Sequence, residues 1–204
     1  MKRKYGLFAL VTSAVLLVAS LATHAAVGPR ITLQSLQTQL NHRYTKADID
    51  AKLCVPAKLK RYCDNGDGTV TDTRTHLVWL KKANCLGSQN WTTAMSSAAA
   101  LAHGDVTCNL SDGSQAGHWR LPLVGEWEAM VDWTYTFPAL SNAEGTGQWT
   151  EGDAFSGVQS TYYWSSSSVA NNSGNAWFVL LSNSGVGGVV KTHTYHVWPV
   201  RGGQ

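Results

Sequence analysis

The stretch Asp64-Asn-Gly-Asp-Gly-Thr-Val-Thr-Asp72 opens a series of short phrases that decide the fold of this chain. Later phrases each contain a tryptophan, and in order they are Leu77-Val-Trp79, Gly117-His-Trp-Arg-Leu-Pro122, Glu126-Trp-Glu128, Tyr162-Tyr-Trp-Ser-Ser-Ser-Ser168, Ala176-Trp-Phe-Val179 and Val197-Trp-Pro-Val-Arg-Gly-Gly203. Within the first stretch, Asn65-Gly-Asp-Gly68 is a strong signal for a hairpin turn between two strands. Because large aromatic side chains bury much area, the nine tryptophans predict one compact domain with an aromatic core.

Short strands and two helices are expected around these phrases. The predicted strands cover residues 61–64, 69–73, 77–80, 162–165, 176–181, 188–191 and 196–200, and the predicted helices cover residues 91–102 and 124–133. Asn90 is placed to cap the first helix, and Gly104 to end it. Pro199 cannot donate a ladder hydrogen bond, so the last strand should end at a sheet edge or a bulge. Together with long irregular loops between residues 134 and 161, these elements predict an α+β domain.

The first 26 residues are typical of a targeting segment, a signal peptide that is removed on export. Lys2, Arg3 and Lys4 precede an apolar run over residues 7–22, and small residues follow that run. The run is too short, and too rich in alanine and serine, for a membrane span. We therefore expect an exported mature chain without a transmembrane span.

Residues 27–60 are expected to form a helical extension in front of a domain over residues 61–204. Leu33, Leu36 and Leu40 repeat at the spacing of one helix face. About two heptads cannot hold an isolated helix in water. The extension therefore packs either on its own domain or on copies of itself, as a homo-oligomer such as a trimer.

The net charge of the chain is concentrated in the targeting segment. Lys2, Arg3 and Lys4 account for the formal charge of +3, so the mature chain is near neutral. A nucleic-acid-binding domain would be basic overall, and that class of partner is disfavoured. Lys58, Lys60 and Arg61 form a local basic patch that could meet an anionic polymer, although such a run is more often an ordinary solvated stretch.

The four cysteines are expected to form two disulfides, which export permits. Four cysteines allow three pairings, and spacing favours the nearest neighbours, Cys54 with Cys63 and Cys85 with Cys108. In the chain-entropy model each loop would contribute about 2.5–3.5 kcal/mol. A zinc site is the alternative, but the spacings are not Cys-x-x-Cys and the compartment is oxidising.

Five of the phrases, in this order, resemble the Lcl C-terminal domain family of exported bacterial domains. They are Asp64 to Asp72 leading to Leu77-Val-Trp79, Trp119-Arg-Leu-Pro122, Tyr163-Trp-Ser-Ser-Ser167, Ala176-Trp177, and Pro199-Val-Arg-Gly-Gly203. The resemblance covers residues 62–203. It implies a C-type-lectin-like α+β fold related to the formylglycine-generating enzyme, and its best-studied type is an adhesin module that binds sulfated polysaccharide and trimerises.

The sequence departs from the related proteins in the position of its cysteines and in one helix cap. The formylglycine-generating enzyme relies on cysteines late in its chain, whereas all four cysteines here precede the Trp-Arg-Leu-Pro phrase, so no catalytic residue is expected. The family usually places Thr or Asn directly after that phrase, as a helix cap with Glu three residues later. Here the position holds Leu123, with Glu126 retained, so this helix should lack its side-chain cap.

The late region of the chain, which forms the exposed face of lectin-like folds, supplies the candidate ligand-binding residues. Its aromatic residues border the polar stretch at residues 171–175 and the turn at Asn183, and exposed aromatic rings can stack on sugars. Their alternative role is in the core, where most tryptophans belong. The candidates are Tyr162, Asn171, Asn175, Trp177, Lys191 and Tyr195.

Five residues within the apolar phrases are expected to be structural. They are Trp119, Arg120, Pro122, Trp164 and Arg201. Burying a charge alone is costly, so the two arginines should be paired, and Glu126 or Glu128 is the expected partner.

No metal or cofactor site is expected. An EF-hand loop counted from Asp64 would need oxygen ligands at positions held by Gly66 and Gly68. His193 and His196, three residues apart on a strand, would point to opposite faces.

These observations favour an exported, non-enzymatic binding module, adhesin-like, that recognises a carbohydrate or another surface polymer. The expected location is the periplasm or the outside of a bacterium, including the cell surface. Two alternatives are an assembly subunit that oligomerises through the extension and, less favoured, an enzyme of the formylglycine-generating type.

Overall fold

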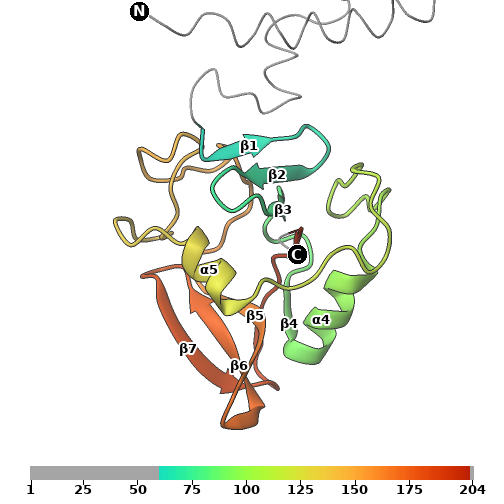
Figure 1. Cartoon of the computed structure of the whole chain (residues 1–204), viewed down its shortest axis with the longest axis vertical. Helices are drawn as coiled ribbons and strands as arrows, with labels where there is room; N and C mark the ends of the chain where they lie inside the picture. The colour runs from blue at the N-terminus through green and yellow to red at the C-terminus, as the bar shows by residue number, and fades with distance from the viewer. Residues whose placement is uncertain (1–59, 203–204) are drawn as a thin grey trace, which may run out of the picture. The chain divides into compact units, whose positions relative to one another are not determined.

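The computed structural model describes residues 60–202, which contain two helices and nine strands in two sheets (Figure 1). The predicted α+β class is confirmed. The targeting segment, the helical extension and Cys54 lie outside the described residues, so the predictions about them remain predictions. Across residues 60–202, no helix has the length and hydropathy that a membrane crossing requires.

The first sheet is built from the hairpin that the opening stretch predicts. Its strands are β1 (Tyr62–Asp64), β2 (Thr69–Asp72), β3 (Val78–Leu80) and β9 (Val200–Arg201), in the order β1-β2-β3-β9 and all antiparallel. At the hairpin, Gly68 has φ +87°, and a Cβ there would lie 2.1 Å from the carbonyl oxygen of Asn109. Glycine is thus required both by the turn and by the loop packed against it.

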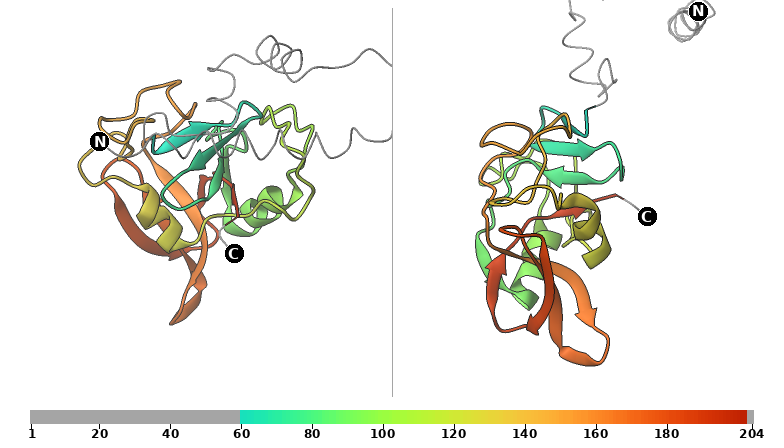
Figure 2. Two further views of the ribbon diagram at one scale, coloured as in Figure 1. Left: turned by 45° about the horizontal axis from the view of Figure 1, so that its top comes forward. Right: turned by 90° about the vertical axis from the view of Figure 1, so that its left-hand side faces the viewer.

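The second sheet has the order β4-β8-β5-β6-β7. Its strands are β4 (Ser88–Asn90), β8 (Thr194–His196), β5 (Tyr162–Val169), β6 (Asn172–Leu180) and β7 (Gly185–Val190). The strand predicted at residues 162–165 continues to Val169, and its β6 partner begins at Asn172. The resulting long hairpin projects from the rest of the domain (Figure 2).

The strand predicted at residues 196–200 is in fact two strands in different sheets. Residues up to His196 pair with β4, whereas Val200 and Arg201 pair with β3. Pro199 lies between them, and its carbonyl accepts a hydrogen bond from the Leu80 amide at 3.2 Å. Proline therefore marks the place where the chain passes from one sheet to the other.

Both helices begin where they were predicted and end earlier. Helix α4 (Trp91–Ala100) is capped by the Asn90 side chain, which accepts from the Thr93 amide at 3.0 Å. Helix α5 (Val124–Met130) ends three residues before its predicted end, because Val131 is extended. The Nη2 group of Arg61 donates to the last two carbonyls of α5, those of Ala129 and Met130, each at 2.8 Å.

The start of α5 confirms the missing side-chain cap. Glu126 accepts from the Leu123 amide at 2.7 Å, but leucine offers no acceptor to the amides of the first turn. Replacing Leu123 with threonine should raise the free energy of unfolding by about 1 kcal/mol. Thermal melts of the two proteins and of a Leu123→Ala control test this. An unchanged or lower melting temperature for the threonine variant would contradict it.

The core is aromatic, as the tryptophan content predicts. Six of the nine tryptophans are buried, and the rings of Trp79, Trp127 and Trp198 pack together with centroids 5.1–5.8 Å apart. Phe155 and Tyr163 close the cluster around Trp198 at 5.0 and 5.7 Å. Trp198 comes from the connection between the two sheets, so it joins both of them to one core.

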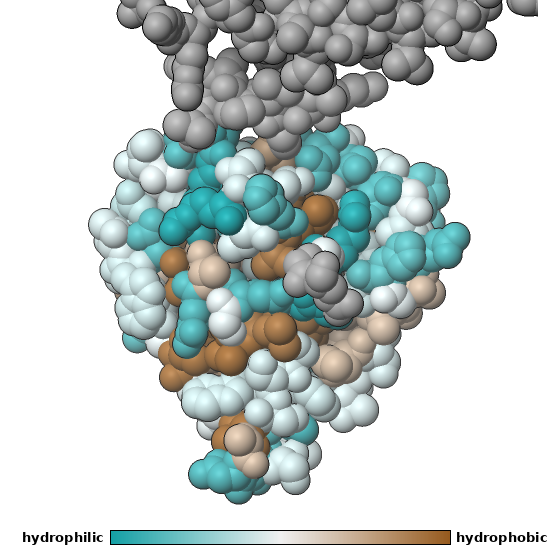
Figure 3. All heavy atoms as spheres, viewed as in Figure 1, coloured by the Kyte–Doolittle hydropathy of each residue, from teal (hydrophilic) through white to brown (hydrophobic). Residues whose placement is uncertain are grey.

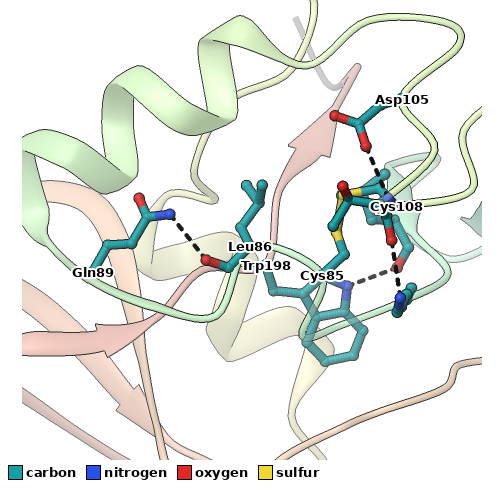
Figure 4. Close-up of a disulfide and its surroundings, with 9 residues drawn as sticks. Cys85, Leu86, Gln89, Asp105, Cys108 and Trp198 are labelled. Atoms are coloured by element: carbon teal, nitrogen blue, oxygen red, sulfur yellow. Dashed lines mark hydrogen bonds between the residues drawn. A yellow bond between two sulfur atoms is a disulfide. The ribbon is translucent and has the colours of Figure 1, made fainter.

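A disulfide joins Cys85 to Cys108, as the spacing predicts (Figure 4). It ties the loop after α4 to the segment after β3, beside the core residue Trp198. The Cys108 amide also donates to the Asp105 carboxylate at 2.9 Å, which fixes the loop further. Cys63 is disulfide-bonded as well, and its predicted partner Cys54 lies outside the described residues.

Arg61 does not belong to a basic surface patch with Lys60, and Lys58, the third residue of the predicted patch, lies outside the described residues. Arg61 is 5% exposed, and its Nη1 donates to the Ser141 hydroxyl at 3.0 Å. Its guanidinium group lies 3.9 Å from the buried Asp72 carboxylate and 4.0 Å from that of Asp132. The side chain is used inside the domain, as the partner of α5 and of two carboxylates, and is unavailable to an anionic polymer.

Candidate functional site

Three neighbouring strands of the second sheet place aromatic side chains on one face. Successive residues of a strand point to opposite faces, so Tyr162 and Trp164 of β5 share a face. In the register of β5 and β6, Trp164 is directly opposite Phe178. Strand β8 runs on the other side of β5 and adds Tyr195 to the same group of rings.

The rings of Tyr162, Phe178 and Tyr195, called here the tyrosine platform, are in mutual contact. The two tyrosine rings are stacked, with centroids 4.7 Å apart and an angle of 15° between their planes. Phe178 meets them edge-on, at 5.2 Å from Tyr162 and 5.4 Å from Tyr195. Trp164, which is fully buried, lies 4.7 Å from Tyr195 and supports the platform from within.

A glycine on the edge strand makes room for this arrangement. Gly187 of β7 is opposite Phe178, and a Cβ at that position would lie 2.8 Å from the tip of the phenylalanine ring. The bare backbone therefore lets the Phe178 ring extend over β7. Side chains that pack this closely have little rotational freedom, so the platform is held in one geometry before any ligand arrives.

Helix α4 covers only part of this sheet face. Ala94 and Ala98 of the helix pack with Trp164 and Ala176 in a small buried cluster, and Phe178 and Tyr195 lie at its border. Tyr162 is 37% exposed. Among the large hydrophobic residues exposed within residues 60–202, Tyr162 is the one whose ring packs on other aromatic rings.

The Tyr195 phenol is a neutral hydrogen-bonding group at physiological pH. Partial burial, and to a smaller extent the neighbouring Tyr162, raise the pKa of the Tyr195 phenol above its ordinary value. A neutral phenol both donates and accepts hydrogen bonds. The exposed His193 ring lies 6.0 Å from that of Tyr195 and adds a further polar group at the border. The platform thus combines apolar ring faces with polar edges.

Of the six predicted ligand-binding residues, the structure brings only Tyr162 and Tyr195 together. Trp177 is adjacent to Phe178 in β6 and so points to the opposite face, as does Asn175 two residues earlier. Asn171 lies in the turn between β5 and β6, at the far end of β5 from Tyr162.

Lys191 lies near the projecting end of the long hairpin. Its amide donates to the carbonyl of Gly174 at 3.0 Å. Its ammonium group lies 4.0 Å from the centre of the Trp91 ring and donates to the Ser168 hydroxyl at 2.7 Å. The lysine therefore has a cation–π partner within the domain and does not join the platform.

The two late histidines do not share a strand, as the prediction had assumed, because His193 lies in the turn before β8 and His196 ends that strand. His196 packs against Tyr163, at 5.4 Å, on the face opposite the platform, and its Nδ1 lies 2.8 Å from the Asn84 side-chain oxygen. Burial lowers the pKa of His196, which keeps the imidazole neutral at pH 7. No cluster of metal-ligating side chains occurs in the part of the chain that the structure describes.

Sequence reasoning missed the third ring and two exposed aromatic residues. Phe178 lies in the strand predicted at residues 176–181, but it was not among the candidate ligand-binding residues, and it is only partly buried. Trp133 and Phe137 are 70% and 72% exposed in the loop after α5. The periodicity of the sequence alone did not indicate that α5 would end early.

On the face shown in Figure 3, hydrophobic residues gather in a band across the middle of the domain.

The family model described as Lcl C-terminal domain matches residues 68–201. No curated protein and no solved structure matches the chain.

Proposed function

The chain belongs to the Lcl C-terminal domain family, and on that basis we propose that it is an exported, non-enzymatic module that binds a carbohydrate or another surface polymer. The observation that carries the proposal is the tyrosine platform, three mutually packed rings at the surface of a sheet. The platform is the place where such a ligand would bind.

The chemistry of the platform suits a pyranose ring. One face of a hexose presents C–H groups, which pack on the negative face of an aromatic ring. Its hydroxyl groups can exchange hydrogen bonds with the phenols of Tyr162 and Tyr195. Pre-packed rings also reduce the entropy lost when a ligand is immobilised. A shallow aromatic surface of this kind favours one or two sugar units of a longer polymer.

The cysteine chemistry supports both export and the lack of an enzymatic role. The disulfide between Cys85 and Cys108 fits an oxidising compartment. A thiolate is needed for catalysis by cysteine, and Cys63, Cys85 and Cys108 are all disulfide-bonded. The formylglycine-generating type of reaction therefore finds no support among these three residues.

A glycan array probed with the folded mature chain tests the proposal. We expect binding to a defined group of glycans, and we expect Tyr162→Ala to lose it while keeping the melting temperature. A Thr161→Ala variant, altered one residue before β5, is the matched control and should keep the wild-type pattern. If folded wild-type protein binds no glycan and no isolated bacterial surface polymer, the proposal is wrong.

A further inference from the structure

A hollow of about 370 Å³ lies away from the platform strands, beside the end of β9. It is lined by Gly117, His118, Arg120, Arg201 and Gly202. Two segments far apart in sequence meet here, because Arg120 and Val200 exchange backbone hydrogen bonds of 3.0 and 2.8 Å. The Trp-Arg-Leu-Pro phrase thereby lies beside the last strand and brings both arginines to one place.

The Nη donors of the first arginine, Arg120, are all used in hydrogen bonds within the domain. The Nη1 and Nη2 groups of Arg120 each donate to one Glu126 carboxylate oxygen at 2.7 Å. They also donate to the carbonyls of Leu121 and Gly202 at 3.2 and 3.0 Å. The hydrogen bond to Glu126 raises the pKa of Arg120. This residue shapes the wall of the hollow and holds Gly202 in place, but its Nη groups have no donor left for a ligand.

The second arginine keeps most of its donors. The Nε of Arg201 lies 3.1 Å from a carboxylate oxygen of Asp112, without hydrogen-bond alignment. Within residues 60–202, its two Nη groups have no hydrogen-bond partner, and about a third of the side chain is exposed. The guanidinium group rests over the Trp119 ring, at 5.4 Å. Two Nη groups, with four N–H bonds, are therefore held at the hollow by a ring and a carboxylate.

The carboxylates that balance these arginines do not face the hollow. The Asp112 side chain is completely buried, and its other oxygen accepts from the Ser114 amide and hydroxyl at 3.1 and 2.7 Å. Glu126 has both oxygens engaged by Arg120 and accepts from the Leu123 amide as well. A ligand in the hollow would therefore meet cationic N–H groups and not the carboxylates.

The exposed imidazole of His118 adds a further donor. Its Nδ1 lies 3.2 Å from the Gln115 amide, which donates to it. A neutral imidazole that accepts at Nδ1 carries its proton at Nε2. Nε2 is thus the nitrogen that can donate to a group in the hollow.

From this set of donors we infer that the hollow binds an oxyanion group, namely a carboxylate, a sulfate or a phosphate. Guanidinium N–H pairs match the geometry of two oxygens of such a group, and the planar fork of Arg201 is the part that would bind them. The volume is within the range of small-molecule sites. The hollow is separate from the tyrosine platform, and ligand binding at either site can be absent without affecting the other.

The histidine signals in NMR spectra of the full mature chain provide the test. Sodium sulfate, sodium phosphate and sodium acetate are titrated separately, with sodium chloride at matched ionic strength as the reference. We expect a saturable shift of the His118 ring signals with at least one oxyanion and none with chloride. His103 is the internal control, because its exposed ring likewise accepts a backbone amide, that of Gly113 at 3.0 Å, away from the hollow.

Variants assign the binding to the named residues. Arg201→Lys keeps a positive charge beside the buried Asp112 and removes the fork, so it should weaken oxyanion binding at least about tenfold. His118→Ala removes the reporting ring, so binding by this variant is followed through the backbone amide signal of Gly202, which also lines the hollow. His118→Ala should weaken binding, and His103→Ala should leave it unchanged. A response to sulfate and phosphate but not acetate would assign a tetrahedral ligand, and the reverse a carboxylate. Equal shifts with chloride, or undiminished binding by Arg201→Lys, would overturn the inference.

Discussion

Replacing Trp198 with alanine is expected to lower the free energy of unfolding by about 3–5 kcal/mol, the range for a fully buried tryptophan. The ring contacts Trp79, Trp127 and Phe155 within 5.0–5.8 Å, and its indole N–H donates to the Leu80 carbonyl at 2.8 Å. Alanine would leave a cavity between the two sheets and an unpaired buried carbonyl. For a domain of this size, that loss is a large share of the total stability.

Urea denaturation of the mature chain measures the effect. Trp198→Phe keeps an aromatic ring and loses the hydrogen bond, so its free energy of unfolding should lie between those of Trp198→Ala and the wild type. Trp133→Ala is the matched control, because this tryptophan is 70% exposed and surface substitutions usually change stability by less than about 0.5 kcal/mol. A loss below about 1 kcal/mol for Trp198→Ala would contradict the assigned core.

The second large effect on stability is expected when the charge of Arg61 is removed. Arg61→Ala is expected to cost about 3–5 kcal/mol, since it leaves buried partners without their counter-charge. Asp72 is completely buried and one of its oxygens has no hydrogen bond, so it depends on the guanidinium group 3.9 Å away. The carbonyls of Ala129 and Met130 at the end of α5 would lose their donor as well.

The neighbouring residue supplies the control for this prediction. Lys60 pairs with Glu144 at 3.2 Å, but both side chains are about half exposed, and such surface pairs contribute about 0–1 kcal/mol. Lys60→Ala should therefore change the unfolding midpoint little. If Arg61→Ala and Lys60→Ala lower the free energy of unfolding by the same amount, Arg61 does not stabilise the domain as a buried charge.

The opening stretch and its turn chemistry predicted the first sheet well. The hairpin at Gly68 and the cap at Asn90 are set by residues a few positions apart, and local physics decides them. The disulfide between Cys85 and Cys108 also followed from spacing. Arg61 could not be assigned in this way, because its partners are up to 80 residues distant in the chain. Beside Lys58 and Lys60 it resembled a surface residue.

The pairing register of β5 and β6 explains why only some residues of the candidate site could be predicted from the sequence. Tyr162 and Tyr195 were predicted from their place beside polar stretches, and they are stacked. Phe178 and Trp177 are neighbours on one strand, so only one of them can share that face. The pairing of Trp164 with Phe178 decides which one does. The sequence shows no register across β5 and β6, and a shift of one residue would have exchanged the two.

The measurement that tests the central claim most directly compares two exposed aromatic residues by calorimetry. Each variant is titrated with the strongest glycan ligand from the array. Tyr162→Ala should weaken binding by about tenfold or more, because truncating an aromatic residue at a binding centre costs about 2 kcal/mol or more. Trp133→Ala, although that ring is more exposed, should bind like wild type. Full affinity in Tyr162→Ala, or loss only in Trp133→Ala, would show that the tyrosine platform is not the binding site.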